Sequence, residues 1–211
     1  MSIASKDKEI CEQLASFDQA HRKNGQLIIG MDEAGRGPLA GPVVAAAVIL
    51  LETPLINGIK DSKKLAEQKR ERLYDEILST AIAFGVGIVD EKTIDEINIL
   101  NAARLAFKRA YDQISIKADV VLTDYIAGLD IPDYIPIVKG DSQSYAIAAA
   151  SIIAKVTRDR MMRAYAEKYP QYGFDTHKGY GAAAHIQAIK AYGACEIHRK
   201  SFLTRILPTD G

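Results

Sequence analysis

The chain has 211 residues, 48% of them hydrophobic and 26% charged, and its formal net charge at pH 7 is zero. This size and composition suit one globular domain, and the neutral charge excludes nucleic-acid binding through overall basicity. The two cysteines lack the CxxC spacing of a zinc site, and no apolar run approaches the ~20 residues of a membrane helix. Because the N-terminus is also too polar for a signal peptide, we expect a cytoplasmic protein.

Hydrophobic periodicity and turn residues predict helices and strands along the whole chain. The expected helices cover residues 6–22, 66–79, 95–114, 144–169 and 182–192. The expected strands cover residues 27–32, 43–51, 81–89, 119–124 and 134–138. Three successive strands favour an antiparallel meander, and the later strand–helix–strand crossover favours parallel addition. We predict a single α/β domain over residues 1–211, with a mixed five-stranded sheet flanked by helices and a C-terminal helical lobe from about residue 145 to 211.

Two carboxylates and a glycine-rich loop follow the first expected strand. Asp32 and Glu33 come directly after an apolar run, where an unpaired buried charge would cost several kcal/mol. A bound divalent cation is a common explanation for such acids. Gly35 and Gly37 would let the backbone approach a ligand closely, and Arg36 carries a fork of donors suited to phosphate. The segment therefore points to phosphodiester chemistry, although a flexible turn would also explain the two glycines.

Two further acids, Asp124 and Asp141, stand near the ends of the fourth and fifth expected strands. The carboxyl ends of parallel strands gather at one edge of a sheet, where ligands usually bind. Convergent carboxylates repel one another unless Mg²⁺ or Mn²⁺ neutralises them. Asp32 and Glu33 can share such a site only if their strand ends or bulges there, because consecutive residues face opposite sides. For Asp141, which precedes a helix, a capping role remains an alternative.

Polar and basic residues elsewhere are candidates for contacts with a nucleic-acid backbone. The candidates are Ser62, Lys63, Lys64, Lys178, Tyr180 and Arg199. Basic groups around an aromatic ring suit a backbone groove with a stacking platform. The alternatives are a solvated helix start for the two adjacent lysines and ordinary packing for Tyr180.

These motifs, in this order, resemble bacterial ribonuclease HII, the type 2 ribonuclease H. The resemblance runs from about residue 27 to 204. It rests on the strings at 32–43, 61–65, 97–100, 139–141, 146–159 and 172–181. It implies a ribonuclease-H-like mixed sheet with a C-terminal helical lobe. The implied activity is endonucleolytic cleavage of RNA in RNA–DNA hybrids and 5′ of single ribonucleotides in duplex DNA, leaving 5′-phosphate and 3′-hydroxyl ends.

The resemblance also implies roles for individual residues. It implies that the metal ligands are Asp32, Glu33, Asp124 and Asp141, which would hold two Mn²⁺ or Mg²⁺ ions. It implies that the ribose 2′-hydroxyl is recognised by Gly35, Arg36, Gly37 and Tyr180. Two positions depart from the family pattern: Tyr125 stands where a small residue is more common, and Ala182 stands where a threonine is usual. The second departure removes a side chain that could contact phosphate.

We expect the partners to be RNA–DNA hybrid and ribonucleotide-containing duplex DNA, with no membrane association. The tail lacks a Gln-rich aromatic motif, so docking on a sliding clamp is not expected, and we expect a monomer. The alternatives are a ribonuclease-H-fold nuclease of other specificity, such as a junction resolvase, and a non-catalytic nucleic-acid-binding module. Four acids argue against the binding module, because they would repel phosphates. The Gly-Arg-Gly loop and Tyr180 favour ribose recognition over a resolvase.

Overall fold

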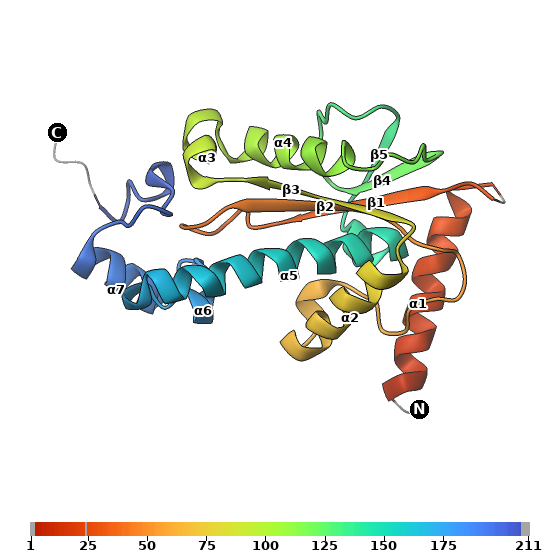
Figure 1. The fold of residues 1–211 in the computed structure, drawn as a ribbon, viewed down its shortest axis with the longest axis horizontal. Helices are drawn as coiled ribbons and strands as arrows, with labels where there is room; N and C mark the ends of the chain where they lie inside the picture. The colour runs from red at the N-terminus through yellow and green to blue at the C-terminus, as the bar shows by residue number, and fades with distance from the viewer. Residues whose placement is uncertain (1–2, 24, 208–211) are drawn as a thin grey trace.

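The computed structural model describes residues 3–23 and 25–207, which form one sheet with helices on both faces (Figure 1). The strands are β1 (Ile28–Ala34), β2 (Val43–Ile49), β3 (Ala83–Val89), β4 (Val120–Asp124) and β5 (Tyr134–Ile137). Their order across the sheet is β3-β2-β1-β4-β5. The first three strands pair antiparallel, whereas β4 and β5 add in parallel to β1. The predicted mixed five-stranded sheet is confirmed.

Seven α-helices are present in the described residues. They are α1 (Ile3–Ala20), α2 (Glu67–Thr80), α3 (Glu91–Ile97), α4 (Ile99–Tyr111), α5 (Tyr145–Lys168), α6 (Phe174–His177) and α7 (Ala183–Tyr192). Helix α4 covers one face of the sheet and α5 covers the other (Figure 1). None of these helices, within the ranges described, is both long enough and apolar enough to cross a membrane.

Small residues allow the two covering helices to lie close to the sheet. Every residue of β2 is buried between the helical layers. On the α5 side, a Cβ added to Gly30 would lie only 2.1 Å from the carbonyl carbon of Ala146. On the α4 side, a Cβ added to Gly87 would lie 1.9 Å from the carbonyl oxygen of Ala106. Since real Cβ atoms never approach so closely, these glycines fix the distance between each helix and the sheet.

The structure differs from the expected elements most clearly at two places. The helix expected over 95–114 is divided at Asn98, whose φ of 66° lies in the left-handed region. The Asn98 side chain accepts hydrogen bonds from the N–H groups of Leu100 and Asn101, so it caps α4. Asparagine tolerates this conformation and favours helix starts, which explains the break. The second difference is that β1 continues to Ala34 instead of ending at Asp32.

Helix α5 connects the sheet to the C-terminal helices. Its first half packs on β1 and β2 and belongs to the core beneath the sheet. Its far end contributes Met162 to a separate cluster with Phe174, Ile189 and Ile197. Ala40, from the segment between β1 and β2, also packs in this cluster. The glycine-rich segment therefore contacts the C-terminal helices directly.

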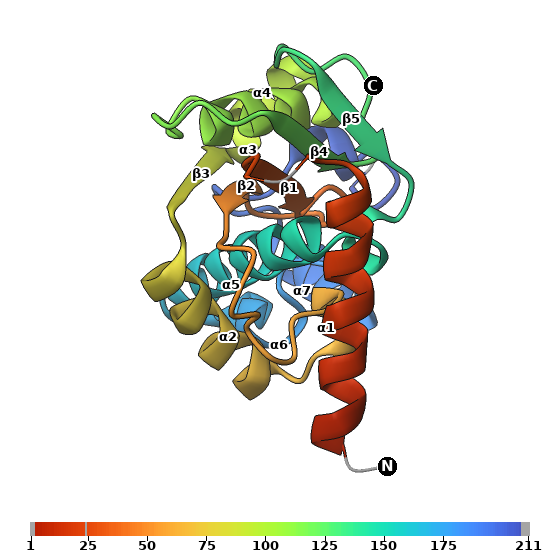
Figure 2. The ribbon, with the colours of Figure 1, turned by 90° about the vertical axis from the view of Figure 1, so that its right-hand side faces the viewer.

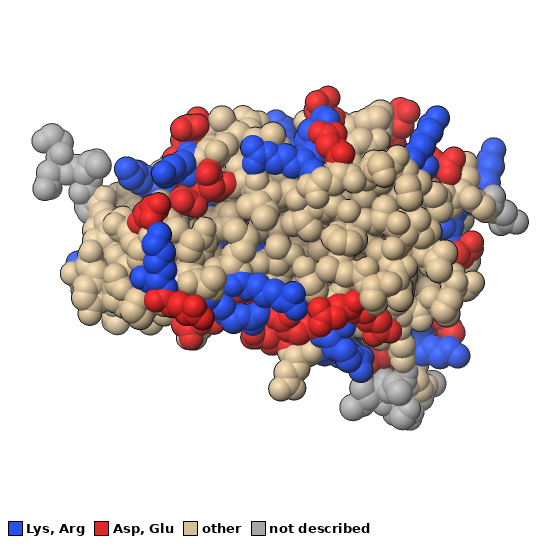
Figure 3. Space-filling model, viewed as in Figure 1, with Lys and Arg blue, Asp and Glu red and all other residues tan. Residues whose placement is uncertain are grey.

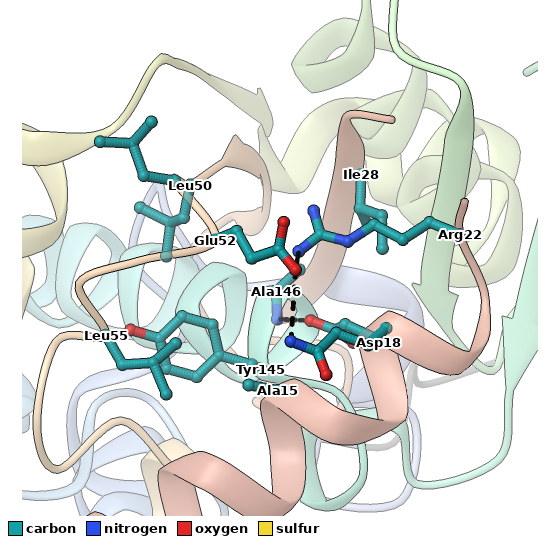
Figure 4. Close-up of a pocket in the computed structure, with 11 residues that line it drawn as sticks. Ala15, Asp18, Arg22, Ile28, Leu50, Glu52, Leu55, Tyr145 and Ala146 are labelled. Carbon is teal, nitrogen blue, oxygen red and sulfur yellow. Dashed lines mark hydrogen bonds and ion pairs between the residues drawn. The ribbon is translucent and has the colours of Figure 1, made fainter. Parts of the chain in front are cut away.

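Helix α1 stands beside the start of α5 (Figure 2). The Asp18 carboxylate accepts a hydrogen bond of 2.8 Å from the Ala146 N–H through Oδ2 (Figure 4). Its other oxygen, Oδ1, is buried without a hydrogen-bond partner among the described residues. Burial raises the pKa of Asp18 from 3.8 to about 6. Nearby, Arg22 pairs with Glu52 at 3.2 Å, which ties the same end of α1 to the segment after β2.

Candidate active site

Three carboxylates converge where β1 and β4 lie side by side. Asp32, Glu33 and Asp124 each offer one oxygen, and these oxygens lie within 4.8 Å of one another. Burial, together with Glu33 and Asp124, raises the pKa of Asp32 well above its usual range. Burial also raises the pKa of Glu33, although Arg36 opposes that shift. Such a cluster is unfavourable by itself, and hard divalent cations prefer oxygen ligands of this kind, so the residues fit a metal site.

Asp32 and Glu33 reach this cluster from a strand that neither ends nor bulges. Both residues pair in regular register with β2, opposite Ala46 and Ala45. The expectation that the strand must end or bulge there for the two acids to share a site is therefore wrong. The ladder between β1 and β4 ends at Met31, so the β4 side of β1 is open beyond that residue. The longer glutamate side chain can bring its carboxylate around this open edge, which explains how neighbours on opposite faces share a site.

Asp141 lies outside the group of three oxygens. It is buried in a 3₁₀ turn, η2 (Gly140–Ser142), and its Oδ2 lies 3.3 Å from Nζ of Lys63. Burial and the charge of Asp61 raise its pKa, and Lys63 opposes that rise. The cap of α5 is Ser144, which accepts from the Ile147 N–H. The capping alternative for Asp141 is therefore wrong.

A hydrogen bond connects η2 to the end of β4. The Gly140 N–H donates to Oδ1 of Asp124 at 2.7 Å. This bond places the Asp141 turn directly beside the cluster of three, and the charge of Asp124 contributes to the raised pKa of Asp141. All four predicted acids thus occupy one region of the sheet edge, with Asp141 on its Lys63 side.

The buried guanidinium group of Arg199 holds the glycine-rich loop from beneath. It donates to the carbonyls of Gly35 (2.6 Å), Arg36 (3.0 Å) and Gly41 (2.8 and 2.9 Å). Burial lowers the pKa of Arg199 to about 9, and the nearby charge of Arg158 adds to that effect. Arg199 has no solvent exposure. This corrects the expectation that Arg199 contacts a phosphate: it holds the loop from inside the protein.

A second buried arginine, Arg158 of α5, connects the same loop to the segment before Tyr180. It donates to the carbonyls of Ala40 (3.0 Å), Pro42 (2.9 Å) and Lys178 (2.9 Å). Gly35 has a φ of +98°, and a Cβ there would lie 2.2 Å from Arg158 Nε. Position 35 must therefore be glycine, because any side chain there would collide with Arg158.

Tyr180 and the loop line one pocket of about 260 Å³ with Asp32 and Glu33. Tyr180 is 44% exposed, and a Cβ added to Gly37 would lie 3.9 Å from its ring. Tyr180 is thus neither buried in the core nor remote from the acids. Its position therefore excludes burial in the core.

The remaining candidates lie around this pocket. Ser62 and Lys63 line it, and Lys63 is largely exposed apart from its contact with Asp141. Lys64 instead faces Asp61, with 3.6 Å between Nζ and Oδ2. The Lys178 ammonium donates to the carbonyl of Asp175. Lys63 is therefore the candidate lysine that the structure brings to the pocket.

Two residues of α5 that the sequence did not single out as site residues, Ser151 and Lys155, also line the pocket. Lys155 Nζ lies 2.5 Å from Oδ1 of Asp159. The two pocket residues are one helical turn apart, so the spacing i, i+4 on a helix facing the acids was the signal that could have identified them.

Charges elsewhere on the surface are mixed in sign. Figure 3 shows Lys and Arg interspersed with Asp and Glu on the face that it presents. Between α2 and α5, Arg160 and Arg163 form ion pairs with Glu67, Glu71 and Asp75. These basic side chains are neutralised locally, which agrees with the zero net charge of the chain.

Comparison with known proteins gives consistent matches. The family model described as Ribonuclease HII matches residues 29–205. The chain is 52% identical over 200 residues to a ribonuclease HII of Ruminiclostridium cellulolyticum, covering 94% of this chain and 78% of that protein. A crystal structure of ribonuclease H2 from Pyrococcus horikoshii OT3 superposes with a TM-score of 0.72 at 30% identity, covering 85% of this chain and 96% of that one.

A further solved structure is that of the PCNA:RNase HII complex from Archaeoglobus fulgidus. It is similar to this chain with a TM-score of 0.68 and 26% identity, covering 86% of this chain and 97% of that one.

Proposed function

The chain belongs to the ribonuclease HII family, and on that premise we propose that its four clustered acids carry the reaction. The protein is a metal-dependent endonuclease that hydrolyses the RNA strand of RNA–DNA hybrids. The proposed catalytic carboxylates are Asp32, Glu33, Asp124 and Asp141. The observation that supports them most directly is the convergence of three carboxylate oxygens within 4.8 Å.

We propose that these acids hold two divalent cations, Mn²⁺ or Mg²⁺. Bound there, such a pair would activate a water for attack on the phosphate and stabilise the departing 3′-oxygen. The carboxylates supply the negative charge that makes the site selective for hard cations, and burial, together with that charge, raises the pKa of Asp32. Lys63 lies against Asp141 and remains largely exposed, so it can also reach a phosphate of the substrate.

Ribose recognition is assigned to the loop and the tyrosine. Gly35, Arg36 and Gly37 lie in the same pocket as Asp32, and Tyr180 lies across from Gly37. The 2′-hydroxyl is the group that distinguishes RNA from DNA, and it can donate and accept a hydrogen bond. The fixed loop backbone is suited to read that hydroxyl. The Tyr180 hydroxyl would add a hydrogen bond, while its ring packs on the neighbouring deoxyribose.

We further propose that cleavage occurs 5′ of a single ribonucleotide embedded in duplex DNA as well as in long hybrids, leaving 5′-phosphate and 3′-hydroxyl ends. We also propose one domain over residues 1–211, a monomeric state and a cytoplasmic location. The free thiols of Cys11 and Cys195 are in keeping with a reducing compartment. Residues 208–211 lie outside the described part of the chain, so the expectation that the tail does not dock on a sliding clamp stays a prediction.

The test is cleavage of a labelled duplex that carries one ribonucleotide. We expect cutting at that position with Mn²⁺ or Mg²⁺, none with EDTA, and none on the matched duplex made only of DNA. Asp141→Asn should be severely impaired, whereas Asp175→Asn, an exposed acid outside the pocket, serves as the matched control. Cutting of the all-DNA duplex would contradict ribose recognition, and a mild defect in Asp141→Asn would remove that residue from the catalytic set.

A further inference from the structure

Two histidines near the C-terminus, His185 and His198, form a continuous hydrogen-bonded system that the proposed chemistry does not use. His185 Nδ1 lies 2.8 Å from the carbonyl oxygen of Tyr180, and His185 Nε2 lies 3.1 Å from His198 Nε2. His198 Nδ1 lies 2.9 Å from the backbone N–H of Cys195. The ring of His177 stacks on that of His185 with centroids 4.4 Å apart. Both His185 and His198 are fully buried.

The partners determine which nitrogen of each ring carries its proton. The Tyr180 carbonyl can only accept, so His185 must donate from Nδ1 and its Nε2 must accept. His198 then donates from Nε2 to His185, and its own Nδ1 accepts from the Cys195 N–H. Hydrogen bonds therefore run in one direction, from Cys195 through His198 and His185 to Tyr180. Each ring can take part only while it is neutral.

The surroundings favour the neutral rings. Phe174 lies edge-on to His185 and near His198, and Tyr172 lies edge-on to His198. Burial lowers the pKa of His198 to about 4 and also lowers that of His185.

The titratable and charged neighbours of this system are few. They are His177, Tyr172, the Cys195 thiol, which has Glu91 and Glu196 near it, and Arg199, whose guanidinium faces the loop carbonyls. His177 has its own partners, the Gly179 N–H and the Tyr172 carbonyl. It therefore packs beside the hydrogen-bonded series without being a link in it.

The hydrogen-bonded series ends at Tyr180, the residue that lies across from the glycine-rich loop. The Tyr180 carbonyl accepts from both His185 and the Ala182 N–H (2.8 Å), which fixes the orientation of its peptide group. On the other side, the Gly179 carbonyl accepts from the Leu39 N–H, and Ala40 forms a β-bridge with His198. The Tyr180 segment is thus held between the histidines and the 39–41 backbone.

We propose that His185, oriented by His198, is a positioning residue that holds Tyr180 at the distance from Gly37 needed to read the ribose. This inference rests on the proposed recognition role of Tyr180. Neither histidine touches the pocket, and both act through the Tyr180 backbone.

Paired amide substitutions test the proposal at each histidine. An Asn amide places its nitrogen where His Nδ1 lies, and a Gln amide reaches the Nε2 position. His185→Asn should therefore retain donation to Tyr180 and keep kcat/KM on a single-ribonucleotide duplex within about twofold of wild type. His185→Gln should lose that bond and lower kcat/KM about fivefold or more, the loss expected for one hydrogen bond. At position 198 we expect the reverse: His198→Gln should keep kcat/KM near wild type and His198→Asn should lower it. The reason is that His198 donates to His185 from Nε2.

The second arm repeats His185→Gln in a Tyr180→Ala background, with thermal melts on every variant. If His185 acts through Tyr180, His185→Gln should lower kcat/KM less than about twofold in the Tyr180→Ala background, because the side chain to be positioned is absent. A full Gln cost in that background, or equal losses for Asn and Gln at both positions, would overturn the positioning role. If Tyr180→Ala alone cuts as fast as wild type, the recognition role of Tyr180 fails and the inference fails with it.

Discussion

The carboxylate cluster and the glycine-rich loop share one pocket, but their buried charges have opposite surroundings. Asp32, Glu33 and Asp124 face one another, and burial together with the charges of Glu33 and Asp124 raises the pKa of Asp32. Arg158 and Arg199 are just as buried, yet their guanidinium groups donate to backbone carbonyls in the loop and beside Tyr180. The acids need a ligand to become favourable, whereas the loop is complete without one.

Because of this difference, substitutions of the acids and of the buried arginines should affect activity and stability differently. A buried donor or acceptor without a partner costs about 1–3 kcal/mol, so removing a fully bonded arginine should destabilise the fold. Removing one of several mutually repelling carboxylates relieves repulsion instead. Substitutions in the two halves of the pocket should therefore have opposite signatures.

The largest effect is expected for Asp32→Asn. Loss of a metal ligand should lower the cleavage rate by more than about 100-fold, because even outer partners of metal ligands cost 10–100-fold. In EDTA the free energy of unfolding should be unchanged or higher than that of wild type. Rates with saturating Mg²⁺ and urea unfolding curves measure the two quantities. Near-wild-type turnover would end the metal assignment, and marked destabilisation would break the contrast with the loop.

Arg199→Met should show the opposite signature. Its loss leaves the Gly35, Arg36 and Gly41 carbonyls without that donor, and we expect the free energy of unfolding to fall by about 2–4 kcal/mol. Urea unfolding of this variant should be compared with that of Arg163→Met, which removes two partly exposed ion pairs, each worth less than about 1 kcal/mol. Equal stability of the two variants would mean that the loop does not depend on its buried cation.

Tyr180 lies on the loop side but faces solvent, so it should affect cleavage more than folding. Tyr180→Ala should slow cutting at a single embedded ribonucleotide about 10-fold or more, since a hydrogen bond plus stacking is worth ~1–3 kcal/mol. Tyr180→Phe keeps the ring and should show a smaller loss. Cleavage rates with thermal melts as the folding control would decide. A wild-type rate for the Ala variant would make Tyr180 a packing residue.

Asp18 offers a smaller test of the same physics outside the pocket. Its folded pKa of about 6 exceeds the ordinary 3.8, so the folded state binds the proton more tightly. The associated stability is present below about pH 4 and is lost as pH rises through about 6, by on the order of 1–3 kcal/mol. Asp18→Asn cannot ionise, so its melting temperature relative to wild type should increase from pH 4.5 to pH 7.5. A constant difference would show that the Asp18 charge is well compensated.

Much of the sheet could be predicted from the sequence because its strands are local apolar runs. The antiparallel start and the acids near strand ends follow from patterns a few residues long, and the parallel addition of the fourth strand follows from the strand–helix–strand crossover. The break at Asn98 was missed because the residues on both sides continue a helical pattern, and only the left-handed backbone of one asparagine interrupts it.

The roles of Arg158 and Arg199 could not be predicted in the same way. Their loop partners lie 116 to 164 residues away in sequence, and no local spacing distinguishes an arginine that bonds carbonyls from one that contacts phosphate. Burial separates the two cases, and burial of a charged residue depends on the complete fold. Ser151 and Lys155, by contrast, share a local helical spacing, and what the sequence could not supply is which face of α5 lies against the acids.

The long span between Arg199 and the loop also sets an order of events during translation. A ribosome has made all four acids once it passes residue 141, but the guanidinium that fastens Gly35 and Gly41 comes 58 residues later (199 − 141). Chains grow at about 5–20 residues per second, so the acids are present for several seconds before their neighbour in the pocket can be fixed. The nascent protein would gain its carboxylates first and the donor that fixes its glycine-rich loop last.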